Sequence, residues 1–214
     1  MRLISTSFKD GDLIPGKYAF CIPNDRGHVC LGSNHNPHLR WEGAPAGTDS
    51  FAVICHDPDV PSKPDDVNQE GKTVPASLPR IDFFHWVMVD IPKTILEIPE
   101  GHYSTEVVPR GKPGPSTHHG ANHGINDYTA WFSGDADMKG NYFGYDGPCP
   151  PWNDSIWHHY IFTVYALNTP TLGLGDNFDG KTALAALQRH VLASAQITGR
   201  YTLNPALKMK NPQA

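Results

Sequence analysis

Three segments of the chain carry the hydrophobic pattern of buried β-strands. Residues 51–55 form a continuous apolar run, which is typical of a strand covered on both faces. Residues 84–91 and 159–167 are rich in β-branched and aromatic residues, and the first of these two runs stops at Pro92. The pattern therefore predicts a mostly β fold with buried central strands.

One helix and one further strand are predicted near the C-terminus. Apolar residues recur at helical spacing through residues 182–194, and either Asp179 or Thr182 is suited to cap the start of a helix there. We expect Gly199 to end this helix, and residues 200–203 to form a last short strand.

Glycine and proline, with 20 residues each, favour short strands joined by shaped loops over long helices. Residues 62–82 are charged and contain prolines, which predicts an exposed excursion. Residues 109–146 are rich in Gly, His and Asn, and so long a loop is either functional or contains short elements. Because no repeat and no linker divides the chain, residues 1–214 are predicted to form a single domain.

The composition is that of a packed globule, with 39% hydrophobic residues and five tryptophans. A formal charge of −5 without any basic run argues against non-specific binding to nucleic acid or to an anionic membrane. The apolar stretches are too short to span a bilayer. Residues 1–15 lack the apolar core of a secretion signal, so we expect a cytosolic protein.

The four cysteines are Cys21, Cys30, Cys55 and Cys149. They show neither a CxxC pair nor metal-ligand spacing, which predicts four reduced thiols. Cys55 closes an apolar strand and is predicted to be buried, whereas Cys149 lies between two prolines and is predicted to be an accessible thiol.

Polar residues occur where loops meet the predicted buried strands. Asp57 and Asp59 follow the first strand, in a stretch whose alternating prolines fix the backbone. His85 and Trp86 open the second strand, where strict alternation places them on opposite faces. Taken alone, a solvated turn and a satisfied core histidine are the plainer interpretations of these two junctions.

The third junction leads from a stiff, proline-rich loop into the third strand. Gly147 allows a ligand to approach the backbone, Pro148 stiffens the loop, and His158 and Tyr160 enter the strand. Function tends to cluster on loops that a rigid scaffold holds. We therefore expect the three junctions to meet at one end of the sheet, as an anion pocket of carboxylate, imidazole and backbone amide groups.

Together these motifs resemble the phosphatidylethanolamine-binding protein family. In chain order they are Asp-Pro-Asp-x-Pro at 57–61, His-Trp-Val at 85–87, Gly-Pro-x-Pro-Pro at 147–151 and His-x-Tyr-x-Phe at 158–162. The intact Tyr-Asp-Gly-Pro-Cys-Pro-Pro at 145–151 is similar to the prokaryotic, Raf-kinase-inhibitor-like branch. The resemblance extends from about residue 8 to residue 201.

The resemblance implies a Greek-key β-sandwich with a C-terminal helix, a few short peripheral helices, and a small site for phosphate, acetate or phospho-headgroups. The pocket positions that it implies are Asp57, Asp59, His85, Gly147, Pro148, His158 and Tyr160, with Trp86 as a wall. It further implies a regulator of a kinase or protease rather than an enzyme, with no cofactor. A homodimer is compatible with it, because prokaryotic relatives often pair.

Two departures from the family pattern stand out. The family usually has His-Arg-Tyr where this chain has His158-His159-Tyr160, which puts a salt bridge of that arginine in doubt. The segment 109–146 is longer and richer in histidine than the family pattern. Its histidines at positions 118, 119 and 123 suggest a metal site, but Gly120 and neighbouring glycines disfavour the helix that would aim them, so we expect solvated loop histidines.

A pocket with an aspartate can bind an anion if that aspartate pairs with a histidine. We expect Asp57 to hold His85 or His158 as imidazolium, with tighter anion binding at mildly acidic pH. Two alternatives stay open: a weak hydrolase or isomerase that uses Asp57 and His85 as an acid–base pair, and a regulator with a vestigial pocket that acts through its surface. The sequence shows no partnered serine or cysteine nucleophile and no glycine-rich phosphate loop.

Overall fold

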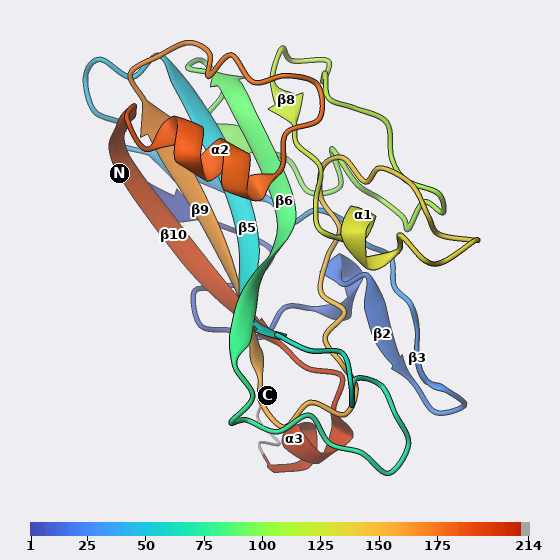
Figure 1. Ribbon diagram of the computed structural model, residues 1–214. Coiled ribbons are helices and arrows are strands. Elements are labelled where there is room, and N and C mark those ends of the chain that lie inside the picture. Colours follow the sequence, from blue (N-terminus) through green and yellow to red (C-terminus); the bar gives the residue numbers. More distant parts are fainter. Residues whose placement is uncertain (211–214) are drawn as a thin grey trace.

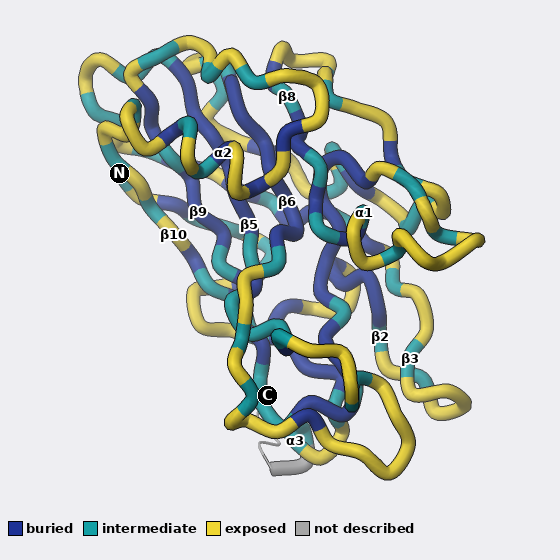
Figure 2. The backbone as a smooth tube through the Cα atoms, in the orientation of Figure 1, coloured by how far each residue is buried: buried dark blue, intermediate teal, exposed yellow. Residues whose placement is uncertain are grey.

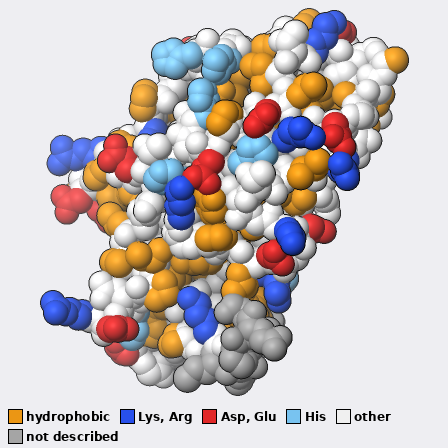
Figure 3. Space-filling view, turned by 180° about the vertical axis from the view of Figure 1, so that it is seen from behind, with side chains coloured by type: hydrophobic (Ala, Val, Ile, Leu, Met, Phe, Trp, Pro, Cys, Tyr) orange, Lys and Arg blue, Asp and Glu red, His pale blue; other side chains and the backbone are white. Residues whose placement is uncertain are grey.

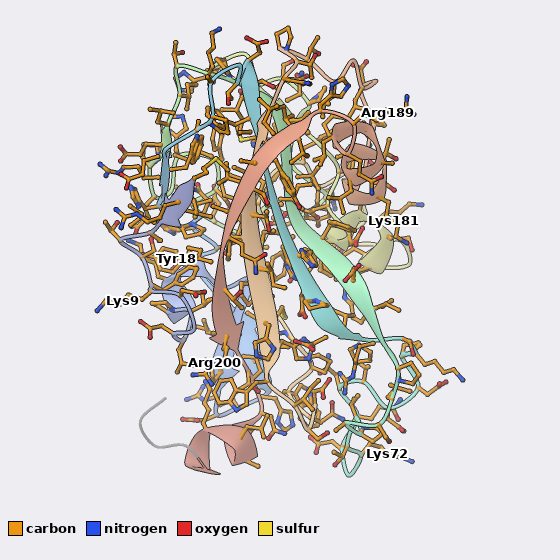
Figure 4. The ribbon with its side chains drawn as sticks, turned by 90° about the vertical axis from the view of Figure 1, so that its left-hand side faces the viewer. Lys9, Tyr18, Lys72, Lys181, Arg189 and Arg200 are labelled. Atoms are coloured by element: carbon orange, nitrogen blue, oxygen red, sulfur yellow. A yellow bond between two sulfur atoms is a disulfide. The ribbon has the colours of Figure 1, made fainter. Side chains whose placement is uncertain are left out.

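An antiparallel five-stranded sheet forms the centre of the computed structural model, which describes residues 1–210 (Figure 1). In spatial order its strands are β10 (Val191–Tyr201), β9 (His158–Leu167), β5 (Ser50–Pro61), β6 (Arg80–Pro92) and β8 (Asn122–His123). Figure 4 shows the four long strands side by side, with the labelled Arg200 on β10. The strands expected at 84–91 and 159–167 lie within β6 and β9, as predicted.

Smaller elements surround this sheet. A three-stranded sheet is formed by β1 (Arg2–Ile4), β4 (Leu39–Glu42) and β7 (Glu97–Ile98), and a hairpin by β2 (Cys21–Asn24) and β3 (His28–Leu31). The helices are the 3-10 turn η1 (Gly16–Tyr18), α1 (Tyr128–Trp131), α2 (Gly180–Leu187) and α3 (Pro205–Lys210). The predicted mostly β sandwich with a few short helices is therefore confirmed.

Both faces of the central sheet are covered. Trp41 of β4 packs edge-on against Phe51 of β5, with ring centroids 5.4 Å apart, inside the large cluster between the two sheets. On the other face Ile54 packs in a smaller cluster with Leu187 of α2. Successive residues of β5 alternate between the two clusters, so this strand is buried on both faces, as its continuous apolar run predicts. Figure 2 shows this buried centre in dark blue.

The helix predicted at 182–194 is shorter than expected. Asp179 caps α2, because its side chain accepts a hydrogen bond from the Thr182 amide at 2.8 Å, but α2 ends at Leu187. Residues from Val191 onward belong to β10, which pairs with β9 along its length. Sheet pairing here overrides the helical spacing of the apolar residues, so the prediction of a helix through residue 194 and of a separate strand at 200–203 is wrong.

The two predicted loops differ in character. Residues 62–79 join β5 to β6 and are largely exposed, as expected. Residues 109–146 contain β8 and α1, so this segment is an elaborated connection with short elements of its own.

Two of the four predicted thiols form a disulfide, so the prediction of four reduced thiols is wrong, whereas the predicted burial of Cys55 is confirmed. Cys21 of β2 and Cys149 form a disulfide across 128 residues of sequence, whereas Cys30 and Cys55 are free, the first exposed and the second buried. The backbone brings the bonded pair together, because the Cys21 amide donates to the Pro148 carbonyl oxygen at 3.1 Å. Disulfides persist mainly in oxidising compartments, so this bond argues against the cytosolic location that residues 1–15 led us to expect.

Within residues 1–210, none of the helices has the length and apolar character that a membrane crossing needs.

The disulfide is open to a direct test. Protein denatured without reductant should show two reactive thiols per chain, from Cys30 and Cys55, and four after reduction. Because the bond closes a loop of 128 residues, Cys149→Ser should lower the free energy of unfolding in urea by on the order of 4 kcal/mol. Cys30→Ser, at an exposed thiol, is the matched control. Four reactive thiols before reduction would contradict the bond.

Candidate functional site

The strands β5, β6 and β9 bring four polar side chains together at one end of the sheet. Asp57 comes from β5, His85 from β6, and His158 and Tyr160 from β9. The His158 ring nitrogen Nδ1 lies 2.7 Å from Asp57 Oδ2, and the rings of His85 and Tyr160 meet edge-on with centroids 5.0 Å apart. All four side chains are buried, with His85 the most exposed at 3%. We call them the Asp57 cluster.

A β-bulge aims His85 into this cluster. Cys55 pairs with Trp86 and the next residue, His56, pairs with Phe84, so His85 is an extra residue in β6. A bulge breaks the alternation of side chains, and it can re-aim one of them. Both His85 and Trp86 consequently contact the large core cluster, and the prediction that they lie on opposite faces is wrong.

His158 lies between two carboxylates. Its Nδ1 is 2.7 Å from Asp57 and its Nε2 is 3.2 Å from Asp154 Oδ2. Ionised carboxylates only accept hydrogen bonds, so both ring nitrogens carry protons and His158 is an imidazolium. Burial alone lowers the pKa of His158, but the charge of Asp57 and hydrogen bonds to both carboxylates outweigh burial and raise it to about 9.

Arg80 completes a line of alternating charges. Its guanidinium group donates to both carboxylate oxygens of Asp154, at 2.5 and 3.0 Å, and to the carbonyl oxygen of Asp59 at 2.8 Å. Two negative charges, on Asp57 and Asp154, thus alternate in contact with two positive charges, on His158 and Arg80. Neither Arg80 nor Asp154 was identified from the sequence, since neither lies in a matched motif.

Asp59 faces away from the cluster. Its Oδ2 accepts hydrogen bonds from the backbone amide of His159 at 2.9 Å and from the exposed His159 ring at 2.8 Å. The second oxygen of Asp57, Oδ1, accepts from the Asp59 amide at 2.8 Å. Asp59 therefore shapes the turn that holds Asp57. His159, at the position where the family pattern has arginine, pairs with the Asp59 carboxylate.

His85 has the opposite protonation state from His158. Its Nδ1 lies 2.8 Å from the carbonyl oxygen of Asp146, which can only accept, so this nitrogen carries the proton of the neutral ring. Burial lowers the pKa of His85 to about 4, although Asp57 and Asp146 act in the other direction. At neutral pH its Nε2 is therefore a lone-pair acceptor. Of the two histidines that the sequence offered as partners of Asp57, only His158 is charged.

The Tyr160 hydroxyl group is the unsatisfied group of the cluster. The oxygen is buried and makes no hydrogen bond of full geometry with the residues that the structure describes, although the Asp57 carboxylate lies close enough to act on it as an acceptor. Burial, followed by the charge of Asp57 and with a contribution from hydrogen bonding to its carboxylate, raises the pKa of this phenol well above its ordinary value, so it remains an O–H donor. A buried hydroxyl without a partner is costly, and such groups mark places where a water or a ligand belongs.

A second buried network holds the loop that faces the cluster. The Asp146 carboxylate is fully buried and accepts hydrogen bonds from Asn34 at 2.7 Å, Asn126 at 2.8 Å and Lys112 at 3.0 Å. Burial raises the pKa of Asp146, and Lys112 opposes that change. Asp146 lies inside the Tyr-Asp-Gly-Pro-Cys-Pro-Pro motif, but its three partners lie far apart in sequence and left no local signal of its role.

Gly147 and Pro148 are buried parts of the same loop. A Cβ atom at Gly147 would lie 2.0 Å from the carbonyl oxygen of Tyr18, so only glycine fits this close approach. The Gly147 carbonyl accepts from the Tyr128 hydroxyl at 2.8 Å, and its amide donates to Asn34 at 2.8 Å. The loop is therefore built into the core.

Trp86 lies beside the cluster, with its indole N–H directed to His123 Nε2 at 3.4 Å. His123 is consequently buried, and the prediction of a solvated loop histidine is wrong for this residue, whereas His118 and His119 are exposed. In residues 1–210 no group of three or more His, Cys, Asp or Glu side chains could hold a metal ion.

The two described cavities lie elsewhere. One of about 560 Å³ is lined by Ile14, Trp157 and Lys208 among others, and one of about 390 Å³ by Asp90 and its neighbours. Neither is lined by the four side chains of the Asp57 cluster, which are almost fully buried.

Comparison with known proteins places these features in a family. A family model described as phosphatidylethanolamine-binding protein matches residues 4–202. The chain is 32% identical to the UPF0098 protein YbhB of Escherichia coli, over 94% of this chain and all of that protein. It is 33% identical to a UPF0098 protein of Methanothermobacter thermautotrophicus, over 94% and 98% of the two chains.

Among solved structures, Escherichia coli YbcL, described as a new member of the mammalian PEBP family, superposes with a TM-score of 0.66. The two chains are 29% identical, with 94% of this chain and 97% of the other covered. The homolog CT736 of Chlamydia trachomatis has the same fold, with a TM-score of 0.62, 24% identity and coverage of 94% and 95%.

The raised pKa of His158 predicts how stability depends on pH. The pKa rises from 6.5 in the unfolded chain to about 9 in the folded one, so the stabilisation is complete below pH 6.5 and is lost as the pH rises towards 9. Between pH 6.5 and 8.5 the His158 contribution to the free energy of unfolding, measured in urea as the difference between wild type and His158→Gln, should fall by roughly 2 kcal/mol, whereas the lowered pKa of His85 acts on the total in the other direction.

The His159→Gln variant is the matched control, because His159 is adjacent but exposed, and it should keep the decline. His158→Gln should lose the decline, at a cost of about 3–5 kcal/mol for breaking a buried ion pair. A difference between wild type and His158→Gln that is flat or rises over this pH range would exclude a buried imidazolium.

Proposed function

Because this chain belongs to the phosphatidylethanolamine-binding protein family, we propose that it binds a small phosphate-bearing ligand, such as a phospho-headgroup, at the Asp57 cluster. The observation that carries the proposal is the buried Tyr160 hydroxyl, which makes no hydrogen bond of full geometry among the described residues, although the Asp57 carboxylate lies nearby. Its O–H group supplies a hydrogen bond to a ligand oxygen. The ligand then satisfies a group that is otherwise buried at a cost of about 1–3 kcal/mol.

The charge of the cluster supports binding of an anion. Asp57 and Asp154 are balanced by His158 and Arg80, so an arriving anion meets no net negative charge. The positive charge does not contact the ligand through His158, because carboxylates occupy both ring nitrogens. This differs from the expectation that an imidazolium meets the anion directly.

The ligand that fits best is a monoprotonated phosphate. Tyr160 donates to one ligand oxygen, and the lone pair on His85 Nε2 accepts from the ligand's own P–O–H group. The second ionisation of a phosphate monoester has a pKa of about 6. Affinity therefore falls as the pH rises through this value, since the ligand loses the proton that His85 accepts.

Binding needs local opening, because the four side chains are at most 3% exposed. Opening and closing around the ligand would change the surface at this end of the sheet. We propose that a partner protein, of the kinase or protease type that the family resemblance implies, responds to this change. The proposal assigns no catalytic step: His158 has no free ring nitrogen, and His85, with a pKa of about 4, is a weak base.

Replacing the unpaired hydroxyl separates ligand binding from stability. In calorimetric titrations with phosphoethanolamine, Tyr160→Phe should weaken binding by about tenfold, the value of one hydrogen bond to a charged group. The same change removes a buried hydroxyl without a partner, so the free energy of unfolding should stay the same or rise. Tyr165→Phe is the matched control, because Tyr165 lies on the same strand against the other core cluster.

Titration of wild-type protein at several pH values tests the protonation of the ligand. Affinity should decline between pH 5.5 and 8 with a midpoint near the ligand's second pKa, and His85→Ala should abolish binding. Affinity that is flat over this range, or an equal loss in both tyrosine variants, would refute the proposed binding mode.

Asp57→Ala and His85→Ala also test how a partner is regulated. If a partner responds to ligand at the cluster, both changes should abolish regulation together with binding. A regulator that works through its surface alone would retain full activity in both variants.

A further inference from the structure

Two exposed histidines far from the Asp57 cluster face each other. The Nε2 atoms of His102 and His119 are 3.1 Å apart, and their rings lie at an interplanar angle of 25°. Two ring nitrogens at this distance share at most one proton, so one of them directs a lone pair at its neighbour. The sequence pattern had suggested His119 with His123, but His123 is buried against Trp86.

The backbone holds both histidines in place. His102 precedes Tyr103 and Ser104, whose amides donate to the side chain of Asn36 at 2.7 and 3.1 Å. His119 lies in a turn closed by the hydrogen bond from the Gly120 amide to the Thr117 carbonyl at 3.2 Å. Gly120 has a φ of +82°, a conformation that glycine adopts readily. The two rings are thus presented by two anchored segments.

We propose that His102 and His119 form a binding site for a divalent transition-metal ion of the Zn²⁺ or Cu²⁺ type. In a tetrahedral site with Zn–N bonds of about 2.0–2.1 Å, two ligand nitrogens lie about 3.3 Å apart. The observed separation of 3.1 Å is close to this value, and a rotation of the exposed rings would direct both nitrogens at one ion. Neutral imidazole is the ligand that these ions prefer.

Water completes the coordination, because no third His, Cys, Asp or Glu side chain of the described residues joins the pair. The site is therefore open, and the ion keeps positions for exchange. Histidine side chains gather at the upper end of the face seen in Figure 3, where solvent reaches them freely. A bound ion would link the segment after β7 to the turn before β8 and so restrain both.

Calorimetric titration of tag-free protein with Zn²⁺ tests the site. Wild-type protein should bind one ion per chain with micromolar affinity, and its melting temperature should rise, because the ion binds only the folded arrangement. Both His102→Asn and His119→Asn should weaken binding by about tenfold or more, since each leaves a single imidazole. Electron paramagnetic resonance of the Cu²⁺ form should show two imidazole nitrogens, reduced to one in either variant.

His28→Asn is the matched control. His28 is also exposed, and at its φ of +65° asparagine is well tolerated, so this variant should bind Zn²⁺ like the wild type. Circular dichroism of all variants shows whether the fold is kept. Absence of Zn²⁺ binding to wild-type protein, or unchanged affinity in His102→Asn and His119→Asn, would overturn the proposal.

Discussion

The buried imidazolium of His158 is the interaction on which the functional end of this protein depends. It bonds Asp57 through one ring nitrogen and Asp154 through the other, and thereby fixes β9 to β5 and to the loop before β9. Removing any one partner would leave an uncompensated charge in the core, which typically costs about 3–5 kcal/mol. One imidazolium cannot balance the charge of two carboxylates. Arg80, which lies outside every recognised motif, supplies the second positive charge by bonding Asp154.

A consequence of this arrangement is that charge and ligand contact are divided between two histidines. His158 is charged and fully engaged, whereas His85 is neutral and held by a backbone carbonyl, with its second nitrogen carrying a lone pair. That carbonyl belongs to Asp146. The side chain of Asp146 is held in turn by a separate buried network with Lys112 and two asparagines. The cluster thus combines balanced charge with one donor and one acceptor for a ligand.

The sequence predicted the central strands and the meeting of Asp57, His85 and His158 well, because long apolar runs and the polar residues at their ends are local signals. It could not predict the bulge at His85, which depends on how β6 pairs with β5. Nor could it predict that the residues after Leu187 pair with β9, or that Cys21 meets Cys149, because both depend on long-range contacts. Asp146 escaped notice for the same reason, whereas Asp154, four residues before His158, was missed because it lies in no matched motif.

The measurement that tests this division of roles most directly is the nitrogen-15 chemical shift of each histidine ring as a function of pH. At pH 7 both ring nitrogens of His158 should show the imidazolium shift and should deprotonate only near pH 9, whereas His85 should show a neutral ring with the proton on Nδ1, down to about pH 4. A neutral His158 at pH 7, or a charged His85, would contradict the account.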